Sequence, residues 1–202
     1  EWFVEGLLDR LLDEDDGVSR ELLAKAVFYI VPNMNPDGSV RGHLRTNAVG
    51  TNLNREWATP TMEKSPEVYL VRQKMLGIGV DMFLDIHGDE NLPYNFVAGA
   101  EGVPSYNSKM AALETSFKQT LLAVTPEFQT QYGYELDAPG QANLTIGSTW
   151  VAEQFKCLSY TVEMPFKDNA NLPDVEFGWS DVRSMKFGAD MLIAVRAVVD
   201  SL

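Results

Sequence analysis

The stretch Asn33–Trp57 reads NMNPDGSVRGHLRTNAVGTNLNREW and has no hydrophobic periodicity. It separates an apolar run of strand type from a segment with a helical pattern. A loop of this length is uncommon in a compact domain unless it carries function. The forked donors of a guanidinium group suit carboxylates, so Arg45 and Arg55, beside Asn54, predict a clamp for an anionic group. The alternative is a solvent-exposed loop made of ordinary turn residues.

Apolar runs on either side of this loop predict the strands of a buried sheet. Ala26–Val31 (AVFYIV) precedes the loop, Val80–Ile86 (VDMFLDI) follows it, and Leu158–Met164 (LSYTVEM) comes late in the chain. Continuous apolar runs of this length are typical of strands that are buried on both faces. Tyr94–Ala98 is a shorter candidate strand.

Segments with helical spacing alternate with these runs. Ser65-Pro66-Glu67 indicates an N-cap followed by proline at the first helical position, and opens a helix through about Gly77. The other predicted helices are Glu1–Asp13, Ser19–Leu23, Ser105–Val124, Leu144–Phe155 and Asp181–Leu202. Strands that alternate with helices predict an α/β fold, with a mixed, mostly parallel central sheet covered by helices on both faces.

Composition narrows the function classes. The chain has 202 residues, of which 45% are hydrophobic and 22% charged, as expected for one globular domain. No run approaches the roughly 18 apolar residues of a transmembrane helix, so no membrane association is expected. The formal net charge of −13 argues against nucleic-acid binding. A single cysteine, Cys157, excludes an intrachain disulfide and favours a reducing compartment, so the expected location is the cytoplasm.

Two residues near strand ends are the main candidates for chemistry. His87 follows Val80–Ile86, and in open α/β sheets such strand ends line the ligand crevice. Glu163 lies on the last apolar run, where burial would raise its pKa toward the range useful for a general base. Each has a structural alternative: histidines after strands are often structural, and Glu163 could lie on the solvent side of a half-buried strand.

The remaining polar candidates carry weaker signals. His43 lies between two arginines of the loop and is expected to be exposed. His87 and Glu90 form an H-x-x-E spacing that can supply two zinc ligands, but a match with two fixed positions often arises by chance. Cys157 lies in an apolar run and is expected to be a buried small residue rather than a nucleophile.

Taken together, these motifs resemble those of the zinc metallocarboxypeptidases, and within them the cytosolic carboxypeptidase-like branch. The matching runs are N-P-D-G (Asn35–Gly38), G-x-x-R (Gly42–Arg45), G-x-N-L-N-R-x-W (Gly50–Trp57), D-I-H-G-D-E (Asp85–Glu90) and T-V-E-M (Thr161–Met164). Their order and spacing are like the family's and cover the chain from about Tyr29 to Glu163.

The resemblance implies a role for each site residue. His87 resembles the third zinc ligand, and Glu163 resembles the general base that deprotonates a zinc-activated water and passes the proton to the leaving amine. Arg45 resembles the arginine that stabilises the oxyanion. Asn54 and Arg55 resemble the pair that grips the terminal carboxylate, in agreement with the anion clamp read from the loop. The implied activity is zinc-dependent removal of the C-terminal residue of a peptide or protein.

The resemblance also implies a catalytic tyrosine on a mobile loop before the glutamate. Tyr132 and Tyr134 both lie in the irregular stretch Pro126–Gly140. We assign Tyr134 to substrate binding, although the sequence leaves the choice between the two open. Family members that remove glutamate carry a basic residue in the side-chain pocket, but Gly140–Gln154 contains neither lysine nor arginine. Lys156 and Lys167 are the candidate substitutes, and a preference for C-terminal glutamate is therefore in doubt.

The family's first two zinc ligands are the His and Glu of an H-x-x-E motif, which in the cytosolic branch precedes a helix. The chain opens at Glu1-Trp2, inside that helix. Residues 1–202 are therefore expected to be an N-terminally incomplete catalytic domain that is inactive by itself, because His87 alone cannot hold a catalytic zinc. In the digestive branch's H-x-x-E-W pattern Glu1 would itself be a ligand. We prefer the cytosolic alignment because WFVEGLLDRL fits its helix, and Glu90 then lies outside the ligand set.

Two other functions stay open at this stage. A zinc amidohydrolase of the aspartoacylase or succinylglutamate desuccinylase kind shares the fold and ligand plan, and would act on a small N-acyl amino acid. A non-catalytic module would keep the carboxylate clamp and bind C-terminal peptides without metal. The presence of both His87 and Glu163 favours a hydrolase, because binding alone needs neither. The oligomeric state is not determined by the sequence.

Overall fold

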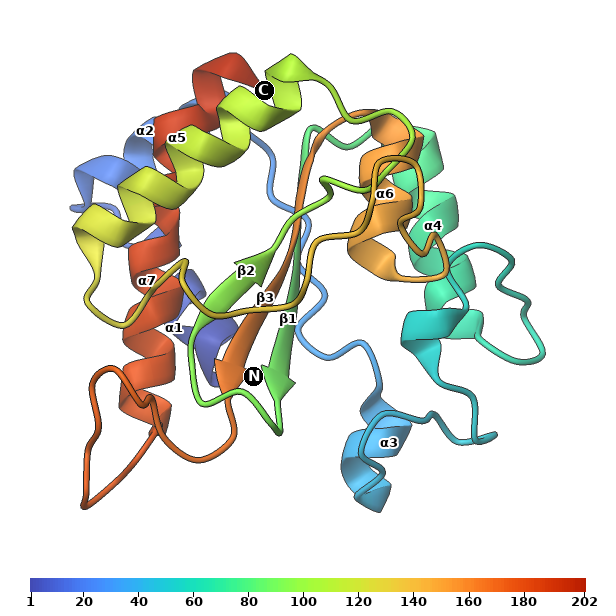
Figure 1. Ribbon diagram of the computed structural model, residues 1–202, viewed down its shortest axis with the longest axis horizontal. Coiled ribbons are helices and arrows are strands. Elements are labelled where there is room, and N and C mark those ends of the chain that lie inside the picture. The colour runs from blue at the N-terminus through green and yellow to red at the C-terminus, as the bar shows by residue number, and fades with distance from the viewer.

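A three-stranded sheet lies at the centre of the computed structural model, which describes all residues 1–202 (Figure 1). Its strands are β1 (Met82–Asp89), β2 (Phe96–Ala98) and β3 (Leu158–Pro165), in the spatial order β1-β3-β2. β1 and β3 are parallel, whereas β2 is antiparallel to β3. The predicted mixed α/β fold is confirmed.

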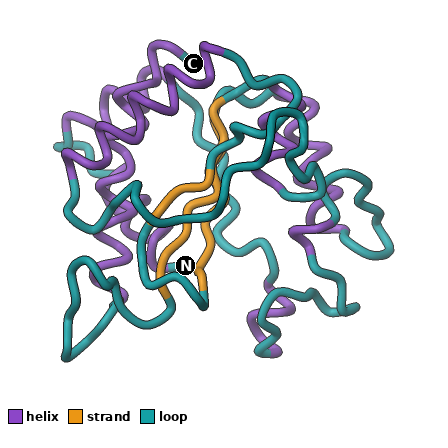
Figure 2. The backbone as a smooth tube through the Cα atoms, viewed as in Figure 1, coloured by secondary structure: helices purple, strands orange, loops and turns teal.

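Helices cover the sheet on both sides (Figures 1 and 2). One side carries α1 (Trp2–Leu11), α2 (Gly17–Lys25), α5 (Ser108–Val124) and α7 (Asp181–Val198). The other side carries α4 (Pro66–Ile78) and α6 (Gly147–Phe155). A short helix α3 (Pro36–Arg41) and the 3₁₀ turns η1 (Leu53–Arg55) and η2 (Val199–Ser201) complete the secondary structure.

The alternation of side chains along the strands separates the core from the site. Leu158, Tyr160 and Val162 of β3 are buried in the main core against α1, α5 and α7. The residues between them point to the opposite face of the sheet because side chains alternate along a strand. There, the Ser159 hydroxyl donates to the Ser148 carbonyl on α6, and Thr161 hydrogen-bonds the Ser148 hydroxyl. The α6 face of β3 is therefore polar.

A smaller core under α4 and α6 fixes the second layer. Trp57, Val68 and Trp150 are buried there, and Phe83 of β1 packs against them. Trp57 follows η1, so this cluster attaches the end of the long polar loop to α6 and to the sheet. The indole ring of Trp57 lies 5.9 Å from the Phe83 ring and 6.0 Å from that of Trp150.

One predicted strand is absent. Ala26–Val31 is extended but pairs with no other strand. Phe28 and Ile30 pack against the main core, whereas Val27 and Tyr29 are exposed. The apolar pattern correctly predicted an extended segment with one buried face, but a strand also needs backbone partners, and none lies beside this segment.

Other element boundaries differ by a few residues, as is common at helix and strand ends. The loop predicted over Asn33–Trp57 contains α3 and η1, which begin at Asn35 and Asn52 caps whose side chains accept backbone hydrogen bonds. Tyr94–Ala98 shortens to β2, and Ser19–Leu23 extends to α2. No helix of this fold has the length and apolar composition needed to span a membrane.

Candidate active site

His87 and Glu163 face each other across the two central strands. The parallel register of β1 and β3 pairs them directly, and both lie on the α6 face of the sheet. The two residues that the sequence placed near strand ends are thus brought together. They line a cavity of about 930 Å³ that also receives Arg45, Asn54, Arg55 and Tyr134.

The imidazole of His87 is oriented by its own strand. Its Nε2 lies 3.1 Å from Asp85 Oδ2, since residues two apart on a strand share a face. Burial lowers the pKa of His87, but the carboxylates of Asp85 and Glu163 together outweigh burial, so the pKa lies above its ordinary value. With Nε2 held by a carboxylate, Nδ1 is the ring nitrogen left for a metal, the arrangement found around many zinc-bound histidines.

Glu163 is a buried carboxyl with an open acceptor. The residue is only 4% exposed, and its Oε1 lies 2.9 Å from the Tyr134 hydroxyl, within hydrogen-bonding distance. Oε2 is buried and has no partner. Burial raises the pKa of Glu163 to about 7, although His87 and Tyr134 act in the opposite direction. An unpartnered oxygen on a buried carboxyl is a candidate proton acceptor.

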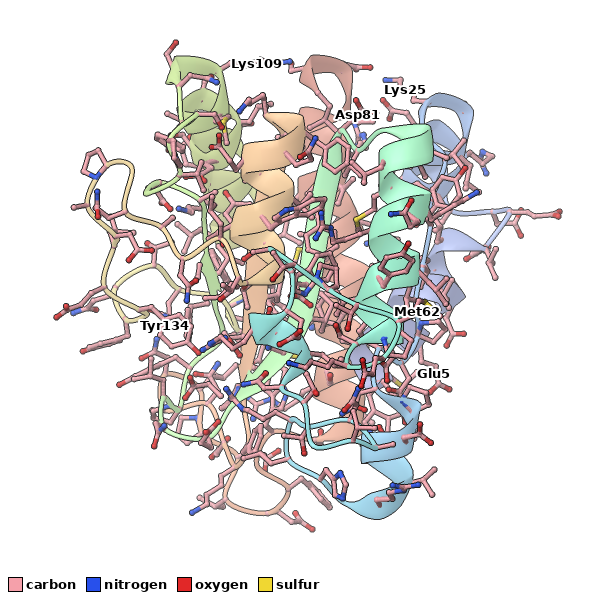
Figure 3. The ribbon with its side chains drawn as sticks, turned by 90° about the vertical axis from the view of Figure 1, so that its right-hand side faces the viewer. Glu5, Lys25, Met62, Asp81, Lys109 and Tyr134 are labelled. Atoms are coloured by element: carbon pink, nitrogen blue, oxygen red, sulfur yellow. The ribbon has the colours of Figure 1, made fainter.

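The structure distinguishes the two candidate tyrosines. Tyr134 reaches Glu163 from the loop between α5 and α6, where Figure 3 labels it. Its hydroxyl also lies 2.6 Å from Asp89 Oδ2. Tyr132 also lines the cavity, but its ring stacks on that of Tyr94 at 4.3 Å, and only Tyr134 reaches Glu163. Tyr134 is therefore the tyrosine in contact with Glu163, and its role in substrate binding stays a prediction.

The long loop supplies the cationic side of the cavity. Arg45 and Arg55 are both exposed, and neither forms an ion pair. Arg55 Nη1 donates to the Asn54 carbonyl at 2.6 Å. The Asn54 side chain accepts from the backbone N–H of Gly147 at the start of α6, 2.9 Å away. This last contact fixes the loop to α6 and leaves two guanidinium groups free for an anion. His43 is exposed, as predicted.

Sequence reasoning missed several carboxylates that line the cavity or contact its lining residues. Asp85 and Asp89 sit two residues on either side of His87, a spacing that places them on its face of the strand and was a usable signal. Glu101 and Lys118 form an ion pair of 2.9 Å in the cavity wall, and Glu114 lies 3.5 Å from the same ammonium group. The i,i+4 spacing of Glu114 and Lys118 on the predicted helix was a usable signal, but no spacing linked Glu101 to them.

Within residues 1–202, no group of three or more His, Cys, Asp or Glu side chains is arranged to hold a metal ion. His87, with Asp85 behind it, fits the part of one zinc ligand and its supporting carboxylate. A catalytic zinc needs three protein ligands. Residues 1–202 therefore supply a candidate for one of the three protein ligands that such a site needs.

Comparison with known proteins identifies the family of this chain. The family described as zinc carboxypeptidase matches residues 2–179. The chain belongs to the zinc carboxypeptidase family. The chain is 52% identical to an uncharacterized protein of Zymomonas mobilis over all of its own length and 53% of that protein's. It is also 24% identical to cytosolic carboxypeptidase 6 of Caenorhabditis elegans, over 81% of the chain and 36% of that protein.

Solved structures of zinc carboxypeptidase relatives have the same fold. A putative carboxypeptidase A from Shewanella denitrificans is 63% identical, with a TM-score of 0.98 over 98% of this chain and 53% of its own. A metallo-carboxypeptidase from Pseudomonas aeruginosa, in complex with (2-guanidinoethylmercapto)succinic acid, is 50% identical with a TM-score of 0.96 over 99% and 53%. The chain thus spans about half the length of these relatives. The resemblance to metallocarboxypeptidases is confirmed.

Proposed function

We propose that this chain is an N-terminally incomplete catalytic domain of a zinc-dependent carboxypeptidase, which hydrolyses the C-terminal peptide bond of a peptide or protein. The observation that carries the proposal is the pairing of His87 with the buried Glu163, whose Oε2 is unpartnered, in a cavity with two unpaired arginines. Neither a binding module nor a structural domain needs a buried free carboxyl group, which costs stability.

Each residue then has a defined task. Glu163 accepts the proton of the attacking water and passes it to the leaving amine, which its raised pKa of about 7 suits. Arg45 stabilises the oxyanion, and Arg55 with Asn54 grips the terminal carboxylate. Tyr134 binds the substrate above Glu163. The succinic acid part of the compound bound by the P. aeruginosa relative is an anion of the kind proposed for this clamp.

His87 is the one zinc ligand that we assign. The metal, when bound in such sites, polarises the carbonyl and lowers the pKa of water. We propose that the other two ligands lie outside residues 1–202, as the half-length coverage of the relatives and the lack of a three-residue metal group support. The 202 residues alone are then inactive. We also propose a cytoplasmic location, in line with the relatives named cytosolic carboxypeptidases.

Metal content tests this proposal in the longest natural form of the protein. We expect about one zinc per chain in the wild type and a clear loss in His87→Ala. His43→Ala is the matched control, because it removes the other histidine, which is exposed on the loop, and should keep the metal. Absence of zinc from the wild-type protein would contradict the proposal that it is a zinc-dependent hydrolase.

Hydrolysis separates the peptidase from an amidohydrolase. Peptides with a free C-terminus should be cleaved, and Glu163→Gln should lower kcat by about 10³-fold while zinc is retained. Cleavage of small N-acyl amino acids with no cleavage of peptides would favour the amidohydrolase instead.

A further inference from the structure

Asp89, at the last position of β1, connects the strand to the tyrosine loop. Its carboxylate is buried, with 7% of the residue exposed. Oδ1 accepts hydrogen bonds from the backbone N–H groups of Asn91 at 2.7 Å and Leu92 at 2.6 Å. Oδ2 faces the other way and accepts from the Tyr134 hydroxyl at 2.6 Å. One oxygen thus closes the turn after β1, and the other is used only by the tyrosine.

Tyr134 has few other restraints. It lies in the stretch between α5 and α6, which has no helix or strand, and it is 49% exposed. Its ring meets the edge of Phe96 at 5.0 Å, and its hydroxyl touches only Asp89 and Glu163. The position of the hydroxyl therefore depends on these two carboxyl groups.

The two contacts are not equivalent. A tyrosine hydroxyl has a single proton and cannot donate to two carboxylates at once. The contact to Asp89 is the shorter, at 2.6 Å against 2.9 Å for Glu163. When the proton is on the Asp89 side, the lone pairs of Glu163 stay free to accept a proton from water, while the ring remains in place.

We propose that Asp89 is a positioning residue that holds Tyr134 above Glu163. The proposal rests on the proposed function for its consequence in catalysis. Its geometric part does not depend on that function, because the contact joins two side chains of this chain. The competing explanation is that Asp89 only closes the turn to Leu92.

Asp89→Asn separates these two explanations. The backbone donors of Asn91 and Leu92 require an oxygen, so the amide carbonyl takes that side and the turn is kept. The amide NH₂ then faces Tyr134, and a charged acceptor has been replaced by a donor. The phenol oxygen can accept from this NH₂, but the phenol proton loses its charged acceptor, so we expect Tyr134 to be held less firmly.

Nitration by tetranitromethane, followed by peptide mass mapping, reports on the phenol directly. Nitration of Tyr134 should be several-fold faster in Asp89→Asn than in the wild type, because the phenolate forms more easily without the carboxylate beside it. Tyr132, stacked on Tyr94, is the internal control and should react at an unchanged rate. An unchanged rate at Tyr134 would overturn the proposal whether or not the protein proves to be a peptidase.

A double-mutant cycle in the full-length protein tests the consequence for peptide hydrolysis. Asp89→Asn should lower kcat/KM by about tenfold in the wild-type background and have almost no effect in a Tyr134→Phe background. Zinc content should be the same in all variants. Glu90→Gln, which removes the adjacent charge but no bond to Tyr134, should show no such coupling. An equal decrease of kcat/KM in both backgrounds would overturn the proposal and show that Asp89 only stabilises the turn after β1.

Discussion

At the scale of single residues, two buried glutamates have similar pKa values but differ in their hydrogen-bond partners. Burial raises the pKa of Glu114 and of Glu163 to about 7 in each case. Glu114 accepts from the Ala100 backbone N–H at 3.2 Å and the Tyr106 hydroxyl at 3.0 Å, so both oxygens are satisfied. Glu163 has one oxygen without a partner. The first is therefore a structural carboxyl, and the second has a free acceptor for a proton.

Glu114 makes stability depend on pH. Its pKa is raised in the fold from 4.5 to about 7, so its contribution is fully present below about pH 4.5 and is lost as pH rises through about 7. The Glu114→Gln variant has no titratable group at this position, so it lacks this pH dependence. We expect its free energy of unfolding, relative to wild type, to rise by about 2 kcal/mol between about pH 5 and about pH 8.

Urea unfolding at a series of pH values measures this difference. Glu5→Gln, on the exposed face of α1 and labelled in Figure 3, is the control and should show no comparable change. A difference between Glu114→Gln and wild type that is constant over this pH range would contradict the interpretation.

At the scale of elements, α1 and α7 cross at two glycines. A Cβ placed on Gly188 would overlap the carbonyl of Phe3, and a Cβ on Gly6 would overlap that of Met185. Both obstacles are backbone, which cannot turn aside as a side chain can. The close contact lets Phe3 bury its ring edge-on against Phe187, 5.7 Å away.

Gly188→Ala tests this crossing. Alanine in place of glycine normally stabilises a helix by about 1 kcal/mol. Here we expect destabilisation by roughly 2 kcal/mol, because α1 must move away from α7. Gly77→Ala in α4 is the matched control: no heavy atom lies within 4 Å of its added Cβ, so this variant should be slightly more stable than wild type. The free energy of unfolding is measured for both variants and for wild type. A Gly188→Ala variant as stable as wild type would contradict the close approach of α1 and α7.

At the scale of the whole molecule, the cavity gathers charge from segments that are distant in sequence. Its wall holds Glu101, from the segment after β2, and Lys118, from α5, while the clamp comes from the long loop. The Lys118 ammonium is already shared by two carboxylates, Glu101 at 2.9 Å and Glu114 at 3.5 Å. This end of the cavity therefore has no spare positive charge.

Substrate choice should reflect that balance. We expect a peptide ending in glutamine to be hydrolysed roughly tenfold faster than the same peptide ending in glutamate, because a like charge beside the Glu101 carboxylate is unfavourable. Comparing kcat/KM for the pair keeps the shape of the side chain constant. Glu101→Gln should reduce the difference in kcat/KM between the two peptides. Faster cleavage of the glutamate peptide would show that another group reads the C-terminal side chain.

Much of the site could be predicted from the sequence because strand periodicity is local. His87 and Glu163 were found as polar residues near the ends of apolar runs, and the register of β1 and β3 brings them together. Asp85 could have been found in the same way, from its spacing to His87. The extended segment Ala26–Val31 was wrongly predicted as a strand, because an apolar run reports burial and not the presence of a pairing partner.

The sequence by itself determined the α/β class, the polar loop with its arginines, and the choice of His87 and Glu163 as candidate residues on two separate strands. These depend on side-chain type and spacing along one segment. Only the tertiary structure brought Tyr134 rather than Tyr132 into contact with Glu163, joined it to Asp89, and paired Lys118 with Glu101. Such contacts join segments with separate periodicities, and their formation depends on how the segments pack in three dimensions, which no local pattern encodes.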